Sequence, residues 1–230
     1  MAGLQGEFGP LSSGSKRGCP GVFVTLEGGE GAGKTTVARS LVEKLESDGI
    51  SVVYTREPGG NVIAEQIREV ILNRDNTAMD ACCEAMLYAA ARRQHLVDVV
   101  LPALEMGSVV LCDRFVDSSV AYQGYARGIG TDLIENINEF AVEGVYPDLT
   151  LFLDITPEEG LARINKDGAR EVNRLDMESR EFHQKVYEGY QMQIKKHPER
   201  IKVVDANRAP NAVAEAAYRL IRDRMVICKV

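Results

Sequence analysis

The sequence lacks three features that mark particular classes of protein: long hydrophobic runs, an excess of positive charge and paired cysteine motifs. A membrane-spanning helix needs roughly 18 or more consecutive apolar residues, and no run approaches that length. The first residues also lack a basic head followed by an apolar core, which argues against a secretory signal. We therefore expect a cytoplasmic protein without a membrane partner.

Charge and cysteine content exclude further classes of protein. The formal net charge of −7 leaves no basic field for nucleic acid or an anionic membrane, so any anionic substrate must be met by locally concentrated cations. The five cysteines contain no C-x-x-C motif. Their odd number fits reduced thiols better than a disulfide framework or a zinc site.

Length and composition predict one domain. A chain of 230 residues that is 45% hydrophobic can bury one good core, which we assign to residues 21–230. Residues 1–20 are rich in Gly and Ser and show little periodicity, which predicts a disordered leader outside the fold.

Short runs rich in β-branched residues alternate with helical patterns along the chain. Each run is apolar almost throughout, as in a strand that is buried on both faces. Strands that alternate with helices predict an α/β fold, in which a parallel sheet is covered by helices on both faces. Ligands bind such sheets beyond the carboxyl ends of the strands. The expected strands are 22–27, 51–55, 108–112, 149–154 and 201–206, and the expected helices are 34–47, 61–73, 80–106, 131–143, 157–166, 178–196 and 210–226.

The stretch from Gly28 to Thr35 lies between the first expected strand and the first expected helix, and it matches G-x-x-x-x-G-K-[ST]. In such a loop the backbone N–H groups point at phosphate oxygens and the helix amino end adds its dipole. The lysine reaches the β and γ phosphates, and the hydroxyl can ligate magnesium. A chance match occurs in about one chain in a hundred of this length. Lys34 and Thr35 therefore predict a nucleoside triphosphate site.

A phosphate-binding loop occurs in GTPases, ATP-driven motors and small-molecule kinases alike. A GTPase reads guanine with N-K-x-D after a late strand, and INKDG at 164–168 resembles that motif. Gly168 stands where the aspartate is required, and the stretch continues the helix expected from Pro157. We therefore discount this motif.

Arginines follow two of the expected strands. Arg56 comes after the second strand, and Arg114 follows Asp113 at the end of the third. An arginine fork can bind phosphate bidentately, and Asp113 stands where a metal-linked carboxylate belongs, so these positions suggest a second phosphate site. Tyr88 and Arg92 lie four residues apart on one helix face, where the ring can stack on a base and the guanidinium can donate to its carbonyl oxygens.

Six segments together resemble the bacterial type of thymidylate kinase, a family of P-loop nucleoside monophosphate kinases. They are EGGEGAGKTT, TREPGG, LYAAARRQ, DRFVDSSVAYQG, PDLTLFLDITPEEGL and the arginine-bearing segment 163–176, and they occur in the family's order and approximate spacing. The resemblance spans residues 21–226. It implies a five-stranded parallel sheet with a short mobile lid, a homodimer, and transfer of the γ-phosphoryl group of ATP to dTMP, giving dTDP and ADP with magnesium.

The resemblance also assigns roles to individual residues. Glu30 would lie near the sugar of dTMP, and Tyr88 would stack on thymine where the family usually has Phe. Tyr122 would close around the deoxyribose, where a ring near C2′ excludes a ribose hydroxyl by crowding. The implied catalytic residues are Lys34, Arg114, Arg170 and Glu30, and the implied metal ligands are Thr35 and Asp113. The implied ATP site consists of Gly28, Gly29, Glu30, Gly31, Ala32, Gly33, Lys34, Thr35, Thr36 and Arg163. The implied dTMP site consists of Arg56, Glu57, Tyr88, Arg92, Arg114, Ser119, Tyr122 and Gln123.

The predicted lid, about 163–176, supplies the remaining cations. The eukaryotic type of this family carries an arginine inside the phosphate loop where this chain has Gly31, so the charge must come from the lid. We hypothesise that Arg170 contacts the transferring group. The family often shows Asp-Arg-Ile-Glu where this chain has Asn-Arg-Leu-Asp at 173–176. The lid cations are Arg163, Lys166, Arg170 and Arg174.

Three other functions remain open at this point. A nucleotide switch would hydrolyse slowly, with no acceleration by a monophosphate. The second function is that of an inactive kinase-like protein that serves as an interaction module. The presence together of Lys34, Thr35, Asp113, Arg56 and Arg114 argues against it. A kinase for UMP or dUMP is the nearest competitor, and ADP release across a panel of monophosphates would separate all of these.

Overall fold

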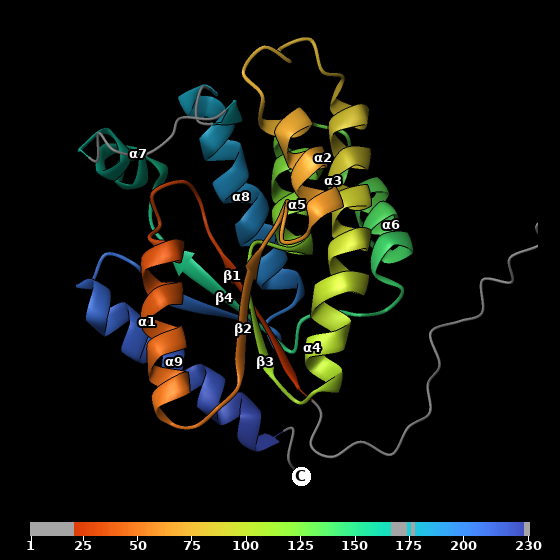
Figure 1. Ribbon diagram of the computed structural model, residues 1–230. Helices are drawn as coiled ribbons and strands as arrows, with labels where there is room; N and C mark the ends of the chain where they lie inside the picture. The colour runs from red at the N-terminus through yellow and green to blue at the C-terminus, as the bar shows by residue number, and fades with distance from the viewer. Residues whose placement is uncertain (1–20, 167–173, 176–177, 228–230) are drawn as a thin grey trace, which may run out of the picture.

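The structure is a computed structural model that describes residues 21–166, 174–175 and 178–227 (Figure 1). Five strands form one sheet in the order β2-β3-β1-β4-β5, and every neighbouring pair is parallel. The carboxyl ends of the strands therefore share one edge of the sheet. The strands are β1 (Val22–Glu27), β2 (Val52–Arg56), β3 (Val109–Asp113), β4 (Leu149–Asp154) and β5 (Ile201–Asp205).

Helices cover both faces of the sheet. On one face α1 (Lys34–Ser47) and α9 (Pro210–Ile227) pack side by side. A layer of helices covers the other face, and α2 (Val62–Leu72) packs on the outside of that layer against α3. That layer is α3 (Ala81–His95), η1 (Leu96–Val100), α4 (Leu101–Glu105), α5 (Val116–Ser119), η2 (Val120–Ala126), α6 (Thr131–Val142) and α8 (Arg180–Lys196), and α7 (Pro157–Lys166) follows β4.

The central strand shows why the sheet needs two covered faces. Val24 and Leu26 of β1 contribute to the core beneath α1 and α9. Phe23 points the other way, and its ring centroid lies 4.9 Å from that of Phe115. All six residues of β1 are buried. The mainly apolar run in the sequence arises because alternate side chains enter two different cores.

The predicted fold class is confirmed, and two helical segments differ from expectation. Residues 116–126, for which we expected no helix, form α5 and η2. The expected helix 80–106 contains the π-helical segment η1, in which the Leu101 N–H bonds to the Leu96 carbonyl. Pro102 accounts for the wider turn, because proline donates no hydrogen bond and its ring crowds the carbonyl four residues earlier.

Some predictions fall outside the described residues. The leader 1–20 and most of the predicted lid, including Arg170, lie there. That residues 21–230 form one domain stays a prediction. Within the part of the chain that the structure describes, no helix is long and apolar enough to cross a membrane.

Candidate active site

The phosphate-binding loop joins β1 to α1 at the carboxyl edge of the sheet. Lys34 is the first residue of α1, and its Nζ donates to the carbonyl oxygens of Gly28 and Gly29, each at 3.0 Å. Burial, together with the nearby charge of Arg114, lowers the pKa of Lys34. The ammonium is thus held against the loop whose backbone N–H groups would receive phosphate.

The same loop touches α7 through two glycines. A Cβ on Gly31, which has φ +72°, would lie 2.1 Å from the Gly160 carbonyl oxygen, and a Cβ on Gly160 would lie 2.2 Å from the Glu30 carbonyl oxygen. Only glycines allow the loop backbone and the α7 backbone to approach this closely. An arginine at position 31 would therefore fit neither the φ angle nor the space.

We expect Gly160→Ala to push the loop away from its present position. Overpacking of this kind costs about 1–3 kcal/mol of stability. The displaced loop should also bind ATP less well, so KM for ATP should rise. Thermal unfolding and KM for ATP are the measurements, with Glu158→Ala on the exposed side of the same helix as the control. Wild-type values for both quantities in Gly160→Ala would contradict the close contact.

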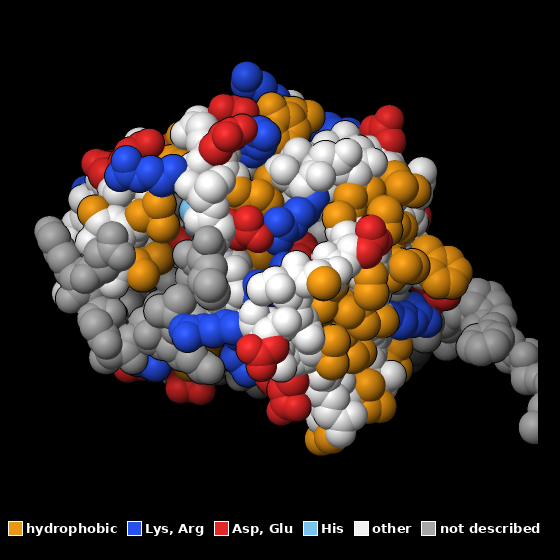
Figure 2. Space-filling model, turned by 90° about the horizontal axis from the view of Figure 1, so that it is seen from above, with side chains coloured by type: hydrophobic (Ala, Val, Ile, Leu, Met, Phe, Trp, Pro, Cys, Tyr) orange, Lys and Arg blue, Asp and Glu red, His pale blue; other side chains and the backbone are white. Residues whose placement is uncertain are grey.

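A single cleft extends from the phosphate-binding loop across the ends of β2 and β3. Its volume is about 1620 Å³, and its walls include residues of α2, α3, η2, α7 and the start of α9. A pocket for one small ligand measures about 300–1,000 Å³, so this cleft has room for two nucleotides. Figure 2 looks onto this end of the molecule and shows acidic and basic side chains gathered in the central hollow.

Arg114 enters the cleft from a strained turn after β3. Its φ is +70°, which is uncommon for a residue other than glycine. Two hydrogen bonds to β1 hold this turn: the Arg114 N–H donates to the Leu26 carbonyl at 2.9 Å, and the Phe115 N–H donates to Glu27 Oε1 at 2.8 Å. The end of β1 therefore fixes where the Arg114 side chain begins.

The Arg114 guanidinium is held above the phosphate-binding loop. Its Nη2 donates to Glu30 Oε1 at 2.6 Å, and its Nη1 donates to the Gly28 carbonyl and to the Tyr190 hydroxyl, each at 3.2 Å. Its Cζ lies 4.9 Å from the centroid of the Tyr122 ring. The Tyr122 hydroxyl also donates to Glu30, at 3.0 Å. Arg114, Glu30 and Tyr122 thus form one cluster on the cleft wall.

Glu27 lies beneath this cluster and is fully buried. Its Oε2 accepts hydrogen bonds from the hydroxyls of Ser118 at 2.5 Å and Tyr190 at 2.8 Å. Burial, with a further contribution from the charge of Asp117, raises the pKa of Glu27 to about 7.

This raised pKa predicts a pH-dependent stability. Because Glu27 binds its proton more tightly in the native state, the unfolding free energy falls as pH rises between the ordinary value of 4.5 and about 7. We expect Glu27→Gln to remove about 2 kcal/mol of this fall between pH 5 and pH 7.5. Urea unfolding of both proteins across that range is the measurement. An identical pH dependence in the two proteins would show that Glu27 titrates normally.

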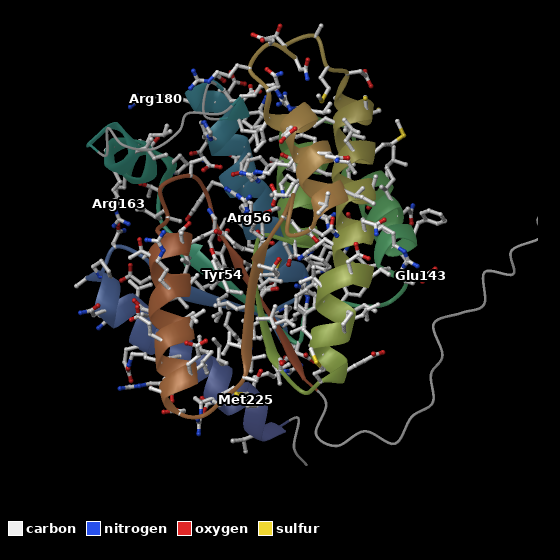
Figure 3. The ribbon with its side chains drawn as sticks, in the orientation of Figure 1. Tyr54, Arg56, Glu143, Arg163, Arg180 and Met225 are labelled. Carbon is white, nitrogen blue, oxygen red and sulfur yellow. The ribbon has the colours of Figure 1, made fainter. Side chains whose placement is uncertain are left out.

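Arg56 is the last residue of β2 and reaches the cleft from the opposite wall. Its Nη2 donates to both carboxylate oxygens of Glu65, at 2.9 and 3.0 Å. The Gly60 N–H donates to Glu65 as well, at 2.9 Å. In Figure 3, Arg56 lies at the end of β2 and Arg163 on α7, on opposite sides of the phosphate-binding loop.

Arg92 and Tyr88 form the inner wall of the cleft from α3. Arg92 is 2% exposed, and its Nε donates to Glu57 Oε2 at 2.8 Å. Burial is the main cause that raises the pKa of Tyr88, so this phenol stays neutral. Ser119 accepts a hydrogen bond from Arg92, and Gln123 donates to Glu84. The structure therefore brings the predicted acceptor-side residues Arg56, Glu57, Tyr88, Arg92, Arg114, Ser119, Tyr122 and Gln123 to one cleft.

The other predicted site residues and lid cations do not all lie in the cleft. Thr35, Thr36, Asp113 and Arg163 line the cleft on the loop side, and Arg163 Nη2 donates to the Ala206 carbonyl at 2.9 Å. Arg174 lies elsewhere, because its Nε donates to the Ile71 carbonyl at 2.9 Å and its Nη2 pairs with Glu84. Arg170 is outside the described residues.

Sequence reasoning missed three residues around the cleft. Arg68 of α2 lines it, and its Nη1 donates to the Pro58 carbonyl at 2.9 Å. Arg68 lies three residues after Glu65 on the same helix face, and this spacing could have identified it from the sequence. Asn138 of α6 and His95 of α3 stand behind Arg92 and Glu57, with no local pattern to reveal them.

The fold and this site define a class of protein. A phosphate-binding loop that faces acceptor-side arginines across one cleft is the arrangement of a P-loop phosphotransferase. The family model described as Thymidylate kinase matches residues 26–217.

Individual relatives agree with the family model. The chain is 60% identical to the thymidylate kinase of Halalkalibacterium halodurans, with 89% of this chain and 98% of the relative covered. It is 59% identical to that of Bacillus pumilus, with 89% and 97% covered. A crystal structure of thymidylate kinase from Ehrlichia chaffeensis superimposes with a TM-score of 0.72 at 32% identity, covering 88% of this chain and all of that one. The chain belongs to the thymidylate kinase family, so the predicted family and enzyme class are confirmed.

Proposed function

We propose that this chain transfers the γ-phosphoryl group of ATP to dTMP, giving dTDP and ADP. One observation carries the proposal: Lys34 of the phosphate-binding loop and the arginines Arg56, Arg92 and Arg114 line the same cleft. A triphosphate on the loop and a monophosphate among the arginines would meet tail to tail. The family of the chain, established above, agrees with this reaction.

The mechanism needs alignment and charge neutralisation. The acceptor is a phosphate oxygen that is already ionised near neutral pH, so no general base is required. Lys34 would neutralise the β and γ phosphates, while Arg56 and Arg114 would hold the acceptor phosphate. Both arginines now contact carboxylates, Glu65 and Glu30, and an acceptor phosphate would take the place of those contacts.

We propose magnesium as the metal of this reaction. Mg²⁺ prefers hard oxygen ligands, keeps several waters and is usually held by one or two protein oxygens together with substrate phosphates. The Thr35 hydroxyl and the Asp113 carboxylate line the cleft and suit that pattern. Among the described residues no group of three or more His, Cys, Asp and Glu could hold a metal without the substrate. When bound, magnesium would neutralise phosphate charge.

Deoxyribose selection follows from the Tyr122 cluster. Tyr122 is 3% exposed, and its hydroxyl is fixed by Glu30. A ring held in this way cannot move aside for a 2′-hydroxyl, so Tyr122 and Glu30 would favour a deoxynucleotide. Tyr88 would stack on the thymine ring, and Gln123 would complete the wall beside the base.

We keep the predicted lid as a proposal, with Arg170 as the cation that contacts the transferring group and Arg163 on the ATP side. The contacts of Arg174 support this choice, because its guanidinium is already engaged by Ile71 and Glu84. Arg170→Ala should lower kcat more than Arg174→Ala. If Arg174→Ala lowered kcat more than Arg170→Ala, Arg174 would be the cation that contacts the transferring group.

A monophosphate panel tests the reaction. ADP release should be fast with dTMP, slower with dUMP and near background with UMP, CMP, AMP and GMP. Equal rates with UMP and dTMP would favour the competing ribonucleotide kinase. Slow hydrolysis that no monophosphate accelerates would indicate a nucleotide switch.

We also propose a homodimer formed through α2, α3 and α6. Several large apolar side chains on these helices are exposed, and Phe140 is 87% exposed. Figure 2 shows hydrophobic side chains gathered on the right-hand part of the face, where α2, α3 and α6 lie in Figure 1. Their number favours burial against a second copy. The residues concerned are Val62, Ile63, Val70, Met86, Leu133 and Phe140.

Phe140→Glu should shift the protein from dimer to monomer, because it places a charge within an apolar contact. Analytical ultracentrifugation measures the change. Met106→Glu, at a residue that is 76% exposed outside these three helices, is the matched control. A Phe140→Glu protein of unchanged mass would place the contact elsewhere.

We propose a cytoplasmic location, which the free thiols of Cys82, Cys83 and Cys112 support.

A further inference from the structure

The Arg92 guanidinium is almost saturated by protein acceptors. An arginine carries five N–H groups in a planar fork. Nε donates to Glu57 Oε2 at 2.8 Å, and Nη1 donates to Asn138 Oδ1 at 2.5 Å. Nη2 donates to the Phe115 carbonyl at 3.1 Å and to Ser119 Oγ at 3.0 Å. Within the described residues, one N–H of Nη1 remains for a ligand.

The acceptors around Arg92 are themselves fixed. Asn138 is 2% exposed, and its Nδ2 donates to the Val116 carbonyl at 3.3 Å, which sets the orientation of the amide. The second oxygen of Glu57 contacts His95 Nδ1 at 2.9 Å. His95 is fully buried, and its Nε2 contacts Thr55 Oγ1 at 2.7 Å. Because a carboxylate only accepts, Nδ1 of His95 carries a proton. Neither Glu57 nor Asn138 can turn away from Arg92.

Asn138 contributes geometry rather than charge. Glu57 already balances the positive charge of Arg92, and an amide adds no further charge. The Asn138 contact occupies one of the two N–H groups on Nη1 and holds that nitrogen against α6. The remaining N–H of Nη1 therefore points in one fixed direction. Because Arg92 lines the cleft, this N–H is the donor that a ligand in the cleft would meet.

We infer that Asn138 and the His95–Glu57 pair are positioning residues that give Arg92 a single fixed donor, with which this chain selects a base carbonyl over a base amino group. We take the 4-position of the base to face that donor. A carbonyl oxygen at this position can accept from it, whereas an amino group presents another donor to it. Sites built around one buried hydrogen bond can reject the wrong partner by about 10⁴–10⁵-fold. The inference rests on the proposed function, because it takes the base of a nucleoside monophosphate as the ligand.

Two variants of Asn138 isolate the contact with Arg92. Asn138→Leu has a similar volume and no acceptor, while Asn138→Asp keeps an oxygen that accepts from Nη1. Neither variant can donate to the Val116 carbonyl, so the loss of that bond is common to both. The substrates are dTMP and 5-methyl-dCMP, which differ at the 4-substituent and the N3 proton. The quantity to compare is kcat/KM for dTMP divided by kcat/KM for 5-methyl-dCMP.

Asn138→Leu should lower this ratio by about tenfold or more, because Arg92 is no longer held in line with the 4-carbonyl of dTMP, whereas the 4-amino group of 5-methyl-dCMP accepts no hydrogen bond in either protein. Asn138→Asp should keep the ratio within about twofold of the wild type. A merely structural role would lower both efficiencies by the same factor and leave the ratio unchanged. An unchanged ratio in an active Asn138→Leu protein overturns the inference.

A second pair of variants decides the matter if Asn138→Leu does not fold. His95→Phe removes the contact with Glu57, and His95→Asn restores a donor near the position of Nδ1. The ratio should fall in His95→Phe and recover in His95→Asn, and equal ratios in the two would overturn the inference. A wild-type protein that releases no ADP with dTMP would instead reject the proposed function, so the two failures are distinguishable.

Discussion

Lys34→Ala should lower kcat by on the order of 10³-fold, the size of effect found when one preorganised charge is removed from a reacting oxygen. Lys34 is 8% exposed, and its Nζ is fixed by the carbonyls of Gly28 and Gly29. The ammonium therefore needs little reorganisation when negative charge develops on the transferring group. Its depressed pKa shows that burial already opposes the charge, so its removal should not unfold the protein.

Lys44→Ala is the matched control for this variant. Lys44 belongs to the same helix, but its side chain is 43% exposed and its Nζ pairs with Glu215 at 2.6 Å, away from the cleft. Its replacement should leave kcat unchanged, since exposed ion pairs contribute little. Steady-state ADP release gives both values. If kcat of the Lys34→Ala protein were within tenfold of the wild-type value, the phosphate-binding loop would have no role in the reaction.

Arg114→Ala should lower kcat/KM for dTMP by about 10³-fold, because the acceptor phosphate loses a bidentate partner at the point of transfer. Arg114→Lys should recover little of this loss. A lysine is a point charge and cannot reproduce two N–H groups held by Glu30 and Tyr190. The effect should appear with saturating ATP, since the substitution acts on the acceptor side.

Arg180→Ala provides the comparison for Arg114. Arg180 is an exposed arginine at the start of α8, marked in Figure 3, and its replacement should leave kcat/KM unchanged. Phosphoryl transfer to dTMP at a series of acceptor concentrations is the measurement. If Arg114→Lys restored full activity, the fork geometry would have no role.

The sequence predicts those parts of the site whose signal is local. The loop from Gly28 to Thr35 is contiguous, and its glycines, lysine and hydroxyl stand at the spacing that phosphate binding requires. Arg56 and Arg114 were found because strand ends of a parallel sheet share one edge, and both lie there in the structure. The apolar runs of the strands predicted the sheet because both of its faces are buried.

The residues behind Arg92 could not be predicted in this way. Asn138 is 46 positions from Arg92 and occupies one polar position in an amphipathic helix. Only the packing of α6 against α3 brings the two together. The helical turns at 116–126 were missed for a related reason, since Ser118 and Tyr122 are fixed by Glu27 and Glu30 of β1 and its loop. Tertiary contacts there override weak local propensity.

The central claim is that one cleft binds two nucleotides with their phosphates end to end. An adenosine and a thymidine joined through their 5′ ends by five phosphates test it most directly, in inhibition kinetics against each substrate. The account predicts competitive inhibition toward both ATP and dTMP, with one equivalent bound per chain by calorimetry. Inhibition that is competitive toward ATP alone, or binding of two equivalents per chain, would contradict it.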